Sequence, residues 1–176
     1  FQREGLSAAP QFLWRRMARI YPLHAFILLA TLAYALALTW AGKADPAQYP
    51  MAELPLHAAL VQNWGLTDRL SWNDPSWSIS TELAAYLLLP PVAFLLFRKD
   101  WPPLACLVGV SGLSLALHGW FVLHGDTNLG AEIVRNGLPR CVAGFFAGVL
   151  VAMAWRADKG SRARLALAAA TATFWG

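Results

Sequence analysis

The stretch Pro-Ser-Trp-Ser-Ile-Ser-Thr-Glu-Leu-Ala-Ala-Tyr-Leu-Leu-Leu-Pro, residues 75–90, places a carboxylate, Glu82, near the start of an otherwise apolar helix. Ser78 lies four residues before Glu82, and Tyr86 lies four residues after it. Because an α-helix has 3.6 residues per turn, this spacing predicts that the three side chains share one helix face. A membrane helix keeps an acidic side chain chiefly where that side chain pairs, faces a cavity or takes part in chemistry.

The composition of the whole chain is typical of a membrane protein. Of its 176 residues, 57% are hydrophobic and 14% are charged, whereas a soluble domain has about 45–50% apolar and about 25% charged residues. The net charge of +4 could indicate a nucleic-acid partner, but the basic residues cluster beside apolar runs instead of forming a binding stripe. We therefore expect an integral membrane protein that spans a lipid bilayer and binds no nucleic acid.

The apolar runs predict an all-α fold, a polytopic membrane helix bundle with about four full crossings. A crossing needs about 20 largely apolar residues, and the runs that provide them are 20–42, 78–97, 101–125 and 136–155. The uncharged run 54–67 is shorter, which favours a re-entrant or interfacial helix. The run 165–176 is also too short to cross, so we expect a truncated last helix there.

The distribution of basic residues predicts the orientation of these crossings. Basic side chains of a membrane protein concentrate in its cytoplasmic loops. Four crossings place ten of the fourteen Lys and Arg residues on one side, namely Arg3, Arg15, Arg16, Arg19, Arg98, Lys99, Arg156, Lys159, Arg162 and Arg164. We expect that side to be cytoplasmic. A further crossing at 54–67 would move Arg98 and Lys99 to the outside, so the sequence argues against it.

The segment Arg15-Arg16-Met-Ala-Arg19 lies just before the first apolar run, and we expect it at the level of the cytoplasmic headgroups. These arginines could simply anchor the helix and set its orientation. Alternatively, they clamp an anionic group such as a phosphate, because guanidinium groups bind phosphate oxygens in a bidentate manner. Pro22 fits the first turn of the following helix, where a missing backbone N–H is harmless.

Glu82 and Arg140 are the other charged residues inside the predicted spans. A partly desolvated carboxylate could orient a base, accept a proton or bind a sugar hydroxyl, but it could also lie near the interface bonded to Ser78. Arg140 could anchor its helix or pair with Glu82.

Gly144 and Gly148 form a GxxxG pattern, which favours close helix packing. The four histidines have no metal-ligand spacing, so we expect hydrogen-bonded structural histidines and no metal site.

Three segments, in order, resemble those of membrane-bound acyltransferase family 3, which includes bacterial O-acetyltransferases of surface polysaccharides. Residues 12–22 are similar to the family's F-x-x-R-R-x-x-R-I-x-P signature. Residues 75–90 resemble its W-S-L-S-x-E-x-x-F-Y-L-x-x-P signature, with Ile79 and Ala85 as departures. Residues 140–150 resemble a later segment that contains an arginine, a phenylalanine, a glycine and a leucine.

The resemblance implies a multi-pass enzyme of the bacterial inner membrane. Such an enzyme transfers an acyl group, typically acetyl, from a cytoplasmic acyl-CoA donor to a hydroxyl of a surface glycan or lipid-linked saccharide. Acyl-CoA is then a co-substrate, and no bound cofactor is expected. On this basis Glu82 and Ser78 are the candidate catalytic residues. The candidate residues for binding donor or acceptor are Arg15, Arg16, Arg19, Trp77, Tyr86 and Arg140.

The sequence departs from the family at its start. Family members begin with two further spans, the first carrying an arginine and a histidine taken to be catalytic, and both precede the Arg-Arg-x-x-Arg segment. Here that segment starts at residue 15. We therefore expect residues 1–176 to be an internal fragment of a single acyltransferase-type transmembrane domain, inactive by itself, within a longer parent protein. Two other interpretations are a transporter or flippase with Glu82 and Arg140 along its path, and a structural membrane subunit; a histidine-bearing span upstream would favour the enzyme.

Overall fold

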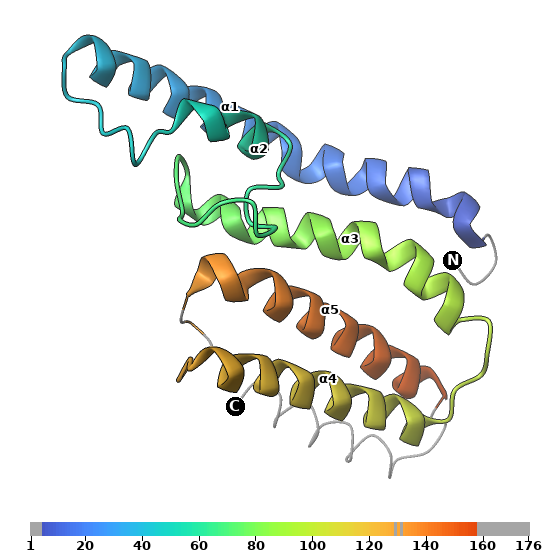
Figure 1. Cartoon of the computed structure of the whole chain (residues 1–176). Helices are drawn as coiled ribbons and strands as arrows, with labels where there is room; N and C mark the ends of the chain where they lie inside the picture. Colours follow the sequence, from blue (N-terminus) through green and yellow to red (C-terminus); the bar gives the residue numbers. More distant parts are fainter. Residues whose placement is uncertain (1–4, 129, 131, 158–176) are drawn as a thin grey trace.

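The computed structural model describes residues 5–128, 130 and 132–157, and this part of the chain contains helices and no strand (Figure 1). Four of its helices are long and apolar enough to cross a membrane: α1 (Ala9–Trp40), α3 (Trp77–Leu96), α4 (Pro103–His124) and α5 (Ile133–Ala157). The predicted all-α class and the four candidate crossings are confirmed. The expected truncated helix at 165–176 lies outside the described residues.

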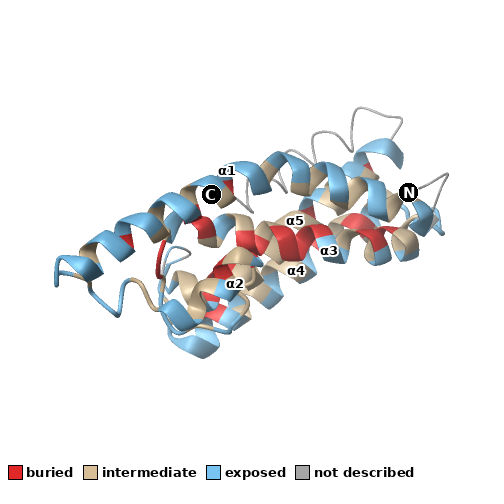
Figure 2. Cartoon of the chain, turned by 90° about the horizontal axis from the view of Figure 1, so that it is seen from above, coloured by how far each residue is buried: buried red, intermediate tan, exposed pale blue. Residues whose placement is uncertain are grey.

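Successive long helices run in opposite directions, so the molecule has two distinct ends (Figure 1). One end, called the basic end below, holds the start of α1, the end of α3, the start of α4 and the end of α5. The opposite end, called the loop end, holds the long connection between α1 and α3. The helices form a row in which α1 packs on α3, α3 on α5 and α5 on α4. Because α3 lies inside this row, it carries the longest run of buried residues (Figure 2).

The first helix begins earlier than the sequence predicts. The predicted span starts at residue 20, but α1 starts at Ala9, with Pro10 in its first turn. Arginine is a good helix former, so the basic segment continues the helix instead of preceding it. The placement of Pro22 in a first turn is therefore wrong, because it lies well inside α1. There it removes one backbone hydrogen bond from the helix interior.

The connection between α1 and α3 contains less helix than predicted. The run 54–67 is helical only over α2 (Leu54–Ala58), which follows a 3-10 turn at Met51–Glu53. Leu60 then adopts a φ of 58° while its side chain is fully buried. This left-handed backbone conformation ends the helix and turns the chain back. A helix of five residues is far too short to cross a bilayer.

The predicted span 78–97 corresponds to α3, and a short turn precedes the start of this helix. A 3-10 turn over Asp74–Ser76 precedes the helix, which begins at Trp77 with Ser76 at the N-cap position. Glu82 consequently lies in the second turn of α3. The side of α3 that faces its neighbours includes small polar residues, Ser80 and Thr81, both almost fully buried. This polar stretch brings the loop end of α3 into contact with the α1–α3 connection, because the Ser80 hydroxyl accepts a hydrogen bond from the Asn63 backbone N–H at 3.2 Å.

Close helix approach occurs at Gly137, not at Gly148 of the GxxxG pattern. A Cβ added at Gly148 would meet nothing within 4 Å. A Cβ at Gly137 would lie 2.8 Å from Asn63 Nδ2 and 3.2 Å from the Trp77 ring. The glycine in the second turn of α5 thus allows that helix to approach both the connection and the start of α3.

We expect Gly137→Ala to destabilise the chain by about 1–3 kcal/mol, the usual effect of overpacking a well-filled site. Gly148→Ala, on the same helix, is expected to leave stability unchanged. The apparent unfolding temperature of the purified chain in detergent measures both effects. Equal stability of the two variants would show that the contact at Gly137 is not close in solution.

Candidate active site

The two charged segments that the sequence treats separately meet in space. The Cζ atom of Arg16, on α1, lies 5.0 Å from the centre of the Tyr86 ring on α3. The hydroxyl of Tyr86 donates a short hydrogen bond to Oε1 of Glu82, one turn away on the same helix. The predicted common face of Glu82 and Tyr86 is therefore confirmed. We refer to Arg16, Tyr86 and Glu82 as the Arg16 cluster.

Aromatic rings from α1 and α5 hold the Arg16 cluster in place. The Tyr86 ring makes edge-to-face contacts with Phe12 of α1 and Phe145 of α5, with centroids 5.8 Å and 6.0 Å away. Arg16 also lies over the Phe12 ring, at 5.3 Å. Edge-to-face contacts fix the orientation of a ring, and Tyr86 is only 6% exposed. Its hydroxyl is thus held in a fixed direction toward Glu82, which is half-buried.

Arg16 contacts the middle of α3. Its partner Tyr86 is the tenth of the 20 residues of α3, which places the contact about 15 Å from either end of that helix. All three arginines lie within α1, and their expected position at the headgroup level stays a prediction. Two aromatic faces stabilise the Arg16 guanidinium, each by about 0.5–2 kcal/mol. An ionisable group held between two candidate membrane helices favours a functional site.

The arginines of α1 line one side of a hollow beside the first turns of that helix, toward the basic end. This hollow has a volume of about 440 Å³, and it is lined by Ala8, Gln11, Phe12, Arg15, Arg16 and Arg19. Arg15 and Arg19 are exposed, whereas Arg16 is half-buried between the hollow and Tyr86. Three guanidinium groups along one hollow form a strongly positive site with many hydrogen-bond donors. Such a site can bind phosphate oxygens. Arg16 also contacts Tyr86, whose hydroxyl is hydrogen-bonded to Glu82.

Two other predicted site residues, Trp77 and Ser78, lie at the start of α3, closer to the loop end than Tyr86. Ser78 is exposed, and its hydroxyl donates to the Pro75 carbonyl at 3.0 Å, so its proton is not directed at Glu82. Trp77 and Arg140 contact each other at the loop end, with Cζ of Arg140 5.4 Å from the indole ring centre. Trp77 precedes Tyr86 by nine residues, about 13 Å along the helix axis. Trp77 thus lies apart from Tyr86, and Arg140 contacts Trp77.

The structure adds a buried polar group that the sequence did not single out as functional. Nε2 of His24 donates to the His57 carbonyl at 2.8 Å, and Nε2 of His57 lies 2.9 Å from the Ser71 hydroxyl. Ser71 in turn donates to Glu53 at 2.8 Å. Both histidines are at most 3% exposed, so the expectation of hydrogen-bonded structural histidines is confirmed for them. The sequence signal for this group was the concentration of polar residues in the α1–α3 connection of an otherwise apolar protein. These residues have no periodicity, so their contacts could not be inferred from the sequence.

Burial lowers the pKa of His57, with an opposing contribution from the nearby Glu53 carboxylate and smaller ones from His24 and Asp74. A histidine whose pKa is lower in the folded than in the unfolded state binds protons less readily when folded. Its contribution to stability is therefore complete above the unfolded pKa, about 6.5, and declines as the pH falls below that value.

We therefore expect the unfolding temperature of the chain to fall between pH 7 and pH 5, and we expect His57→Gln to reduce this fall. His118→Gln is a suitable control because His118 is exposed on α4. Thermal unfolding in detergent across this pH range measures the difference. An identical pH dependence in the two variants would contradict the assignment.

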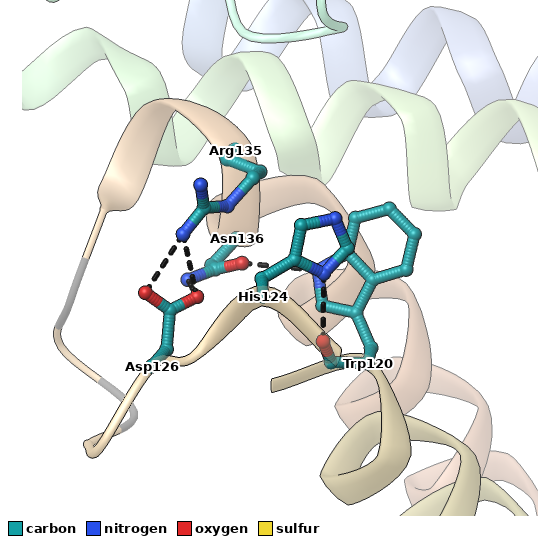
Figure 3. Close-up of polar contacts among 5 residues, drawn as sticks. All are labelled: Trp120, His124, Asp126, Arg135 and Asn136. Atoms are coloured by element: carbon teal, nitrogen blue, oxygen red, sulfur yellow. Dashed lines mark hydrogen bonds and ion pairs between the residues drawn. The ribbon is translucent and has the colours of Figure 1, made fainter. Parts of the chain in front are cut away.

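A second polar cluster joins α4 to α5 at the loop end (Figure 3). The Asp126 carboxylate accepts hydrogen bonds from Arg135 at 2.7 and 2.8 Å and from Asn136 at 2.8 Å. Asn136 accepts a hydrogen bond from Trp120 at 3.0 Å, and the ring of His124 lies over the Trp120 ring at 4.3 Å. The hydrogen bonds from Asn136 and Arg135 lower the pKa of Asp126. These bonds connect the ends of α4 and α5 across their short connection, which indicates a structural role.

Among the described residues, no three His, Cys, Asp or Glu side chains are grouped so that they could hold a metal ion. Comparison with curated proteins and with solved structures found no match. The model of acyltransferase family 3, described as an acyltransferase domain, matches residues 1–176, the whole chain. This match favours the enzyme over the transporter and the structural subunit, and it agrees with the arginine, serine–glutamate and glycine segments of the sequence. The chain belongs to acyltransferase family 3 and is a membrane acyltransferase.

Proposed function

We propose that the protein transfers an acyl group, typically acetyl, from acyl-CoA bound at the basic end to a hydroxyl of a glycan or lipid-linked saccharide that approaches from the loop end. The observation that carries this proposal is the position of Arg16, which borders both the arginine-lined hollow and the Tyr86–Glu82 pair. One side chain thus connects the arginine-lined hollow to a carboxylate in the second turn of α3.

The hollow supports the donor half of the proposal. Acyl-CoA carries several phosphate groups, and Arg15, Arg16 and Arg19 supply three guanidinium groups along one space of about 440 Å³. Charge-assisted bidentate bonds to phosphate are stronger than neutral hydrogen bonds. Basic residues also concentrate at this end, including Arg98, Lys99 and Arg156, which supports a cytoplasmic location for it and an inner-membrane enzyme.

Glu82 supports the acceptor half. In acyl transfer from a thioester, the acceptor oxygen bonds to the carbonyl carbon, the carbon–sulfur bond breaks, and the hydroxyl proton is finally delivered to the sulfur. Glu82 binds the acceptor hydroxyl and either takes its proton or orients the base that takes it. Tyr86 holds the carboxylate in place, and the positive charge of Arg16 stabilises the negative charge that develops on the carbonyl oxygen.

The orientation part of the proposal can be tested by cysteine labelling in intact cells. With Cys106 and Cys141 replaced by serine, a cysteine at position 43 is expected to react with a membrane-impermeant maleimide added outside. A cysteine at position 98 is expected to react only after the cells are opened, because it lies at the opposite end of the molecule. Labelling of position 98 in intact cells, with position 43 protected, would contradict a cytoplasmic donor site.

A further inference from the structure

The connection between α1 and α3 contains three buried side chains that each leave a polar atom without a hydrogen-bond partner. His57, Gln62 and Asn63 are 2%, 4% and 1% exposed. Within the described residues, His57 Nδ1, Gln62 Oε1 and Asn63 Oδ1 have no hydrogen-bond partner. Leaving a buried polar atom unpaired is unfavourable, so three such atoms on one short segment require an explanation.

The hydrogen bonds of the two amides show that both free atoms are acceptors. Nε2 of Gln62 donates to the Ser76 carbonyl at 3.2 Å and to the Ser76 hydroxyl at 3.0 Å. Nδ2 of Asn63 lies 3.5 Å from the Ile133 carbonyl. A carbonyl can only accept a hydrogen bond, so the amide nitrogens face these carbonyls. The two amide oxygens are therefore the atoms left without a donor.

The tautomer of His57 follows from its neighbours. The Ser71 hydroxyl donates its single proton to Glu53, so toward His57 it can only accept. Nε2 of His57 therefore carries the proton, and Nδ1 carries a lone pair. The lowered pKa of His57 agrees with a neutral ring at neutral pH. All three free atoms are consequently neutral hydrogen-bond acceptors.

These three side chains line one small cavity at the loop end. Its volume is about 10 Å³, which is room for a single group of the size of a water molecule or a hydroxyl. Trp77 also lines the cavity, and the exposed residues Arg69 and Asp74 lie at its edge. The cavity is therefore bordered by residues that a solute from the loop end can reach.

We propose that this cavity binds one hydroxyl group of the saccharide acceptor and so selects the acceptor; this inference rests on the proposed function. A hydroxyl is a small neutral group of the size that the cavity admits, and it can donate its one proton to one of the three neutral acceptors. A site built to hydrogen-bond a hydroxyl also discriminates strongly against ligands that lack it. Trp77 precedes Glu82 by five residues, about 7.5 Å along α3, a distance that a saccharide bridges.

The test measures glycoside binding by the chain in lipid nanodiscs, with no acyl donor present. Isothermal titration with methyl glycosides of glucose, galactose, mannose and N-acetylglucosamine is expected to show saturable binding of at least one of them. Gln62→Met and Asn63→Leu, which remove the acceptor oxygens, are expected to weaken this binding at least tenfold. Asn128→Leu, an exposed asparagine at the same end, is expected to leave it unchanged.

A further variant protects the test against misfolding. His57→Gln retains a donor toward Ser71 but loses the ring acceptor Nδ1, so it is expected to fold and to bind the glycoside more weakly. Absence of binding for all four glycosides, or equal binding by the wild-type chain and the three cavity variants, would overturn the proposal and leave a site for an ordered water only. A separate titration with acetyl-CoA distinguishes a failure of this cavity proposal from a failure of the proposed function. A chain that binds acetyl-CoA but no glycoside contradicts this site alone, whereas one that binds a glycoside but not acetyl-CoA contradicts the proposed donor.

Discussion

Glu82→Gln in the full-length protein is expected to reduce acyl transfer by about 10²–10⁴-fold, the usual contribution of a general acid or base. Glutamine keeps the size of the side chain and an acceptor for the Tyr86 hydroxyl, but it cannot take a proton or carry a negative charge. Folding should therefore survive while the chemistry is lost. Transfer of radiolabelled acetyl groups from acetyl-CoA to membrane saccharides measures the effect, with expression and unfolding temperature measured in parallel.

Glu132→Gln is a matched control for this experiment, since Glu132 is an exposed acid at the loop end. We expect it to retain full activity. Tyr86→Phe removes the hydroxyl that holds Glu82 and is expected to give an intermediate loss of rate. Full activity of Glu82→Gln would remove Glu82 from the mechanism. A large loss of stability without a specific loss of rate would make it a structural residue.

The second large effect concerns the arginines of α1. Arg19→Ala is expected to raise the KM for acetyl-CoA about tenfold or more with little change in kcat, because a hydrogen bond to a charged group contributes about 1.5–3 kcal/mol. Arg16→Ala is expected to raise KM and also to lower kcat, because Arg16 borders both the hollow and Tyr86. The difference between the two variants separates donor binding from the chemical step.

Arg156→Ala serves as the control for charge at the basic end, since Arg156 lies at the end of α5 and does not line the arginine hollow. We expect unchanged kinetics for it. If Arg16→Ala and Arg19→Ala also leave the KM for acetyl-CoA unchanged in well-folded protein, the arginines only anchor α1 and set its orientation. Steady-state kinetics at varied acetyl-CoA concentration decides between these outcomes.

The sequence predicted local features of this molecule well. Long uncharged runs identified the four candidate spans, because a bilayer crossing requires them. The four-residue spacing of Glu82 and Tyr86 predicted their contact, because one helix face is a local property. The start of α1 was placed too late because charge marks the end of an apolar run but does not interrupt a helix.

Contacts between distant segments could not be predicted in the same way. Arg16 and Tyr86 are separated in the sequence by most of α1, the α1–α3 connection and the first half of α3, and nothing in either motif indicates that they meet. The buried cluster of His57, Gln62 and Asn63 depends on a reversal at Leu60, where a leucine adopts a left-handed conformation that local propensity disfavours. Tertiary packing stabilises that conformation, so only the folded chain shows it.

The central claim is that Arg16 and Glu82 act as one unit across the α1–α3 contact. A double-mutant cycle on kcat/KM in the full-length protein, with Arg16→Ala, Glu82→Gln and the combination, tests this claim most directly. If the two residues act together, the double variant should be about as slow as the slower single variant, with an interaction energy of at least about 1.4 kcal/mol. If the effects of the two substitutions simply multiply, Arg16 and Glu82 act independently, and the proposed active site is contradicted.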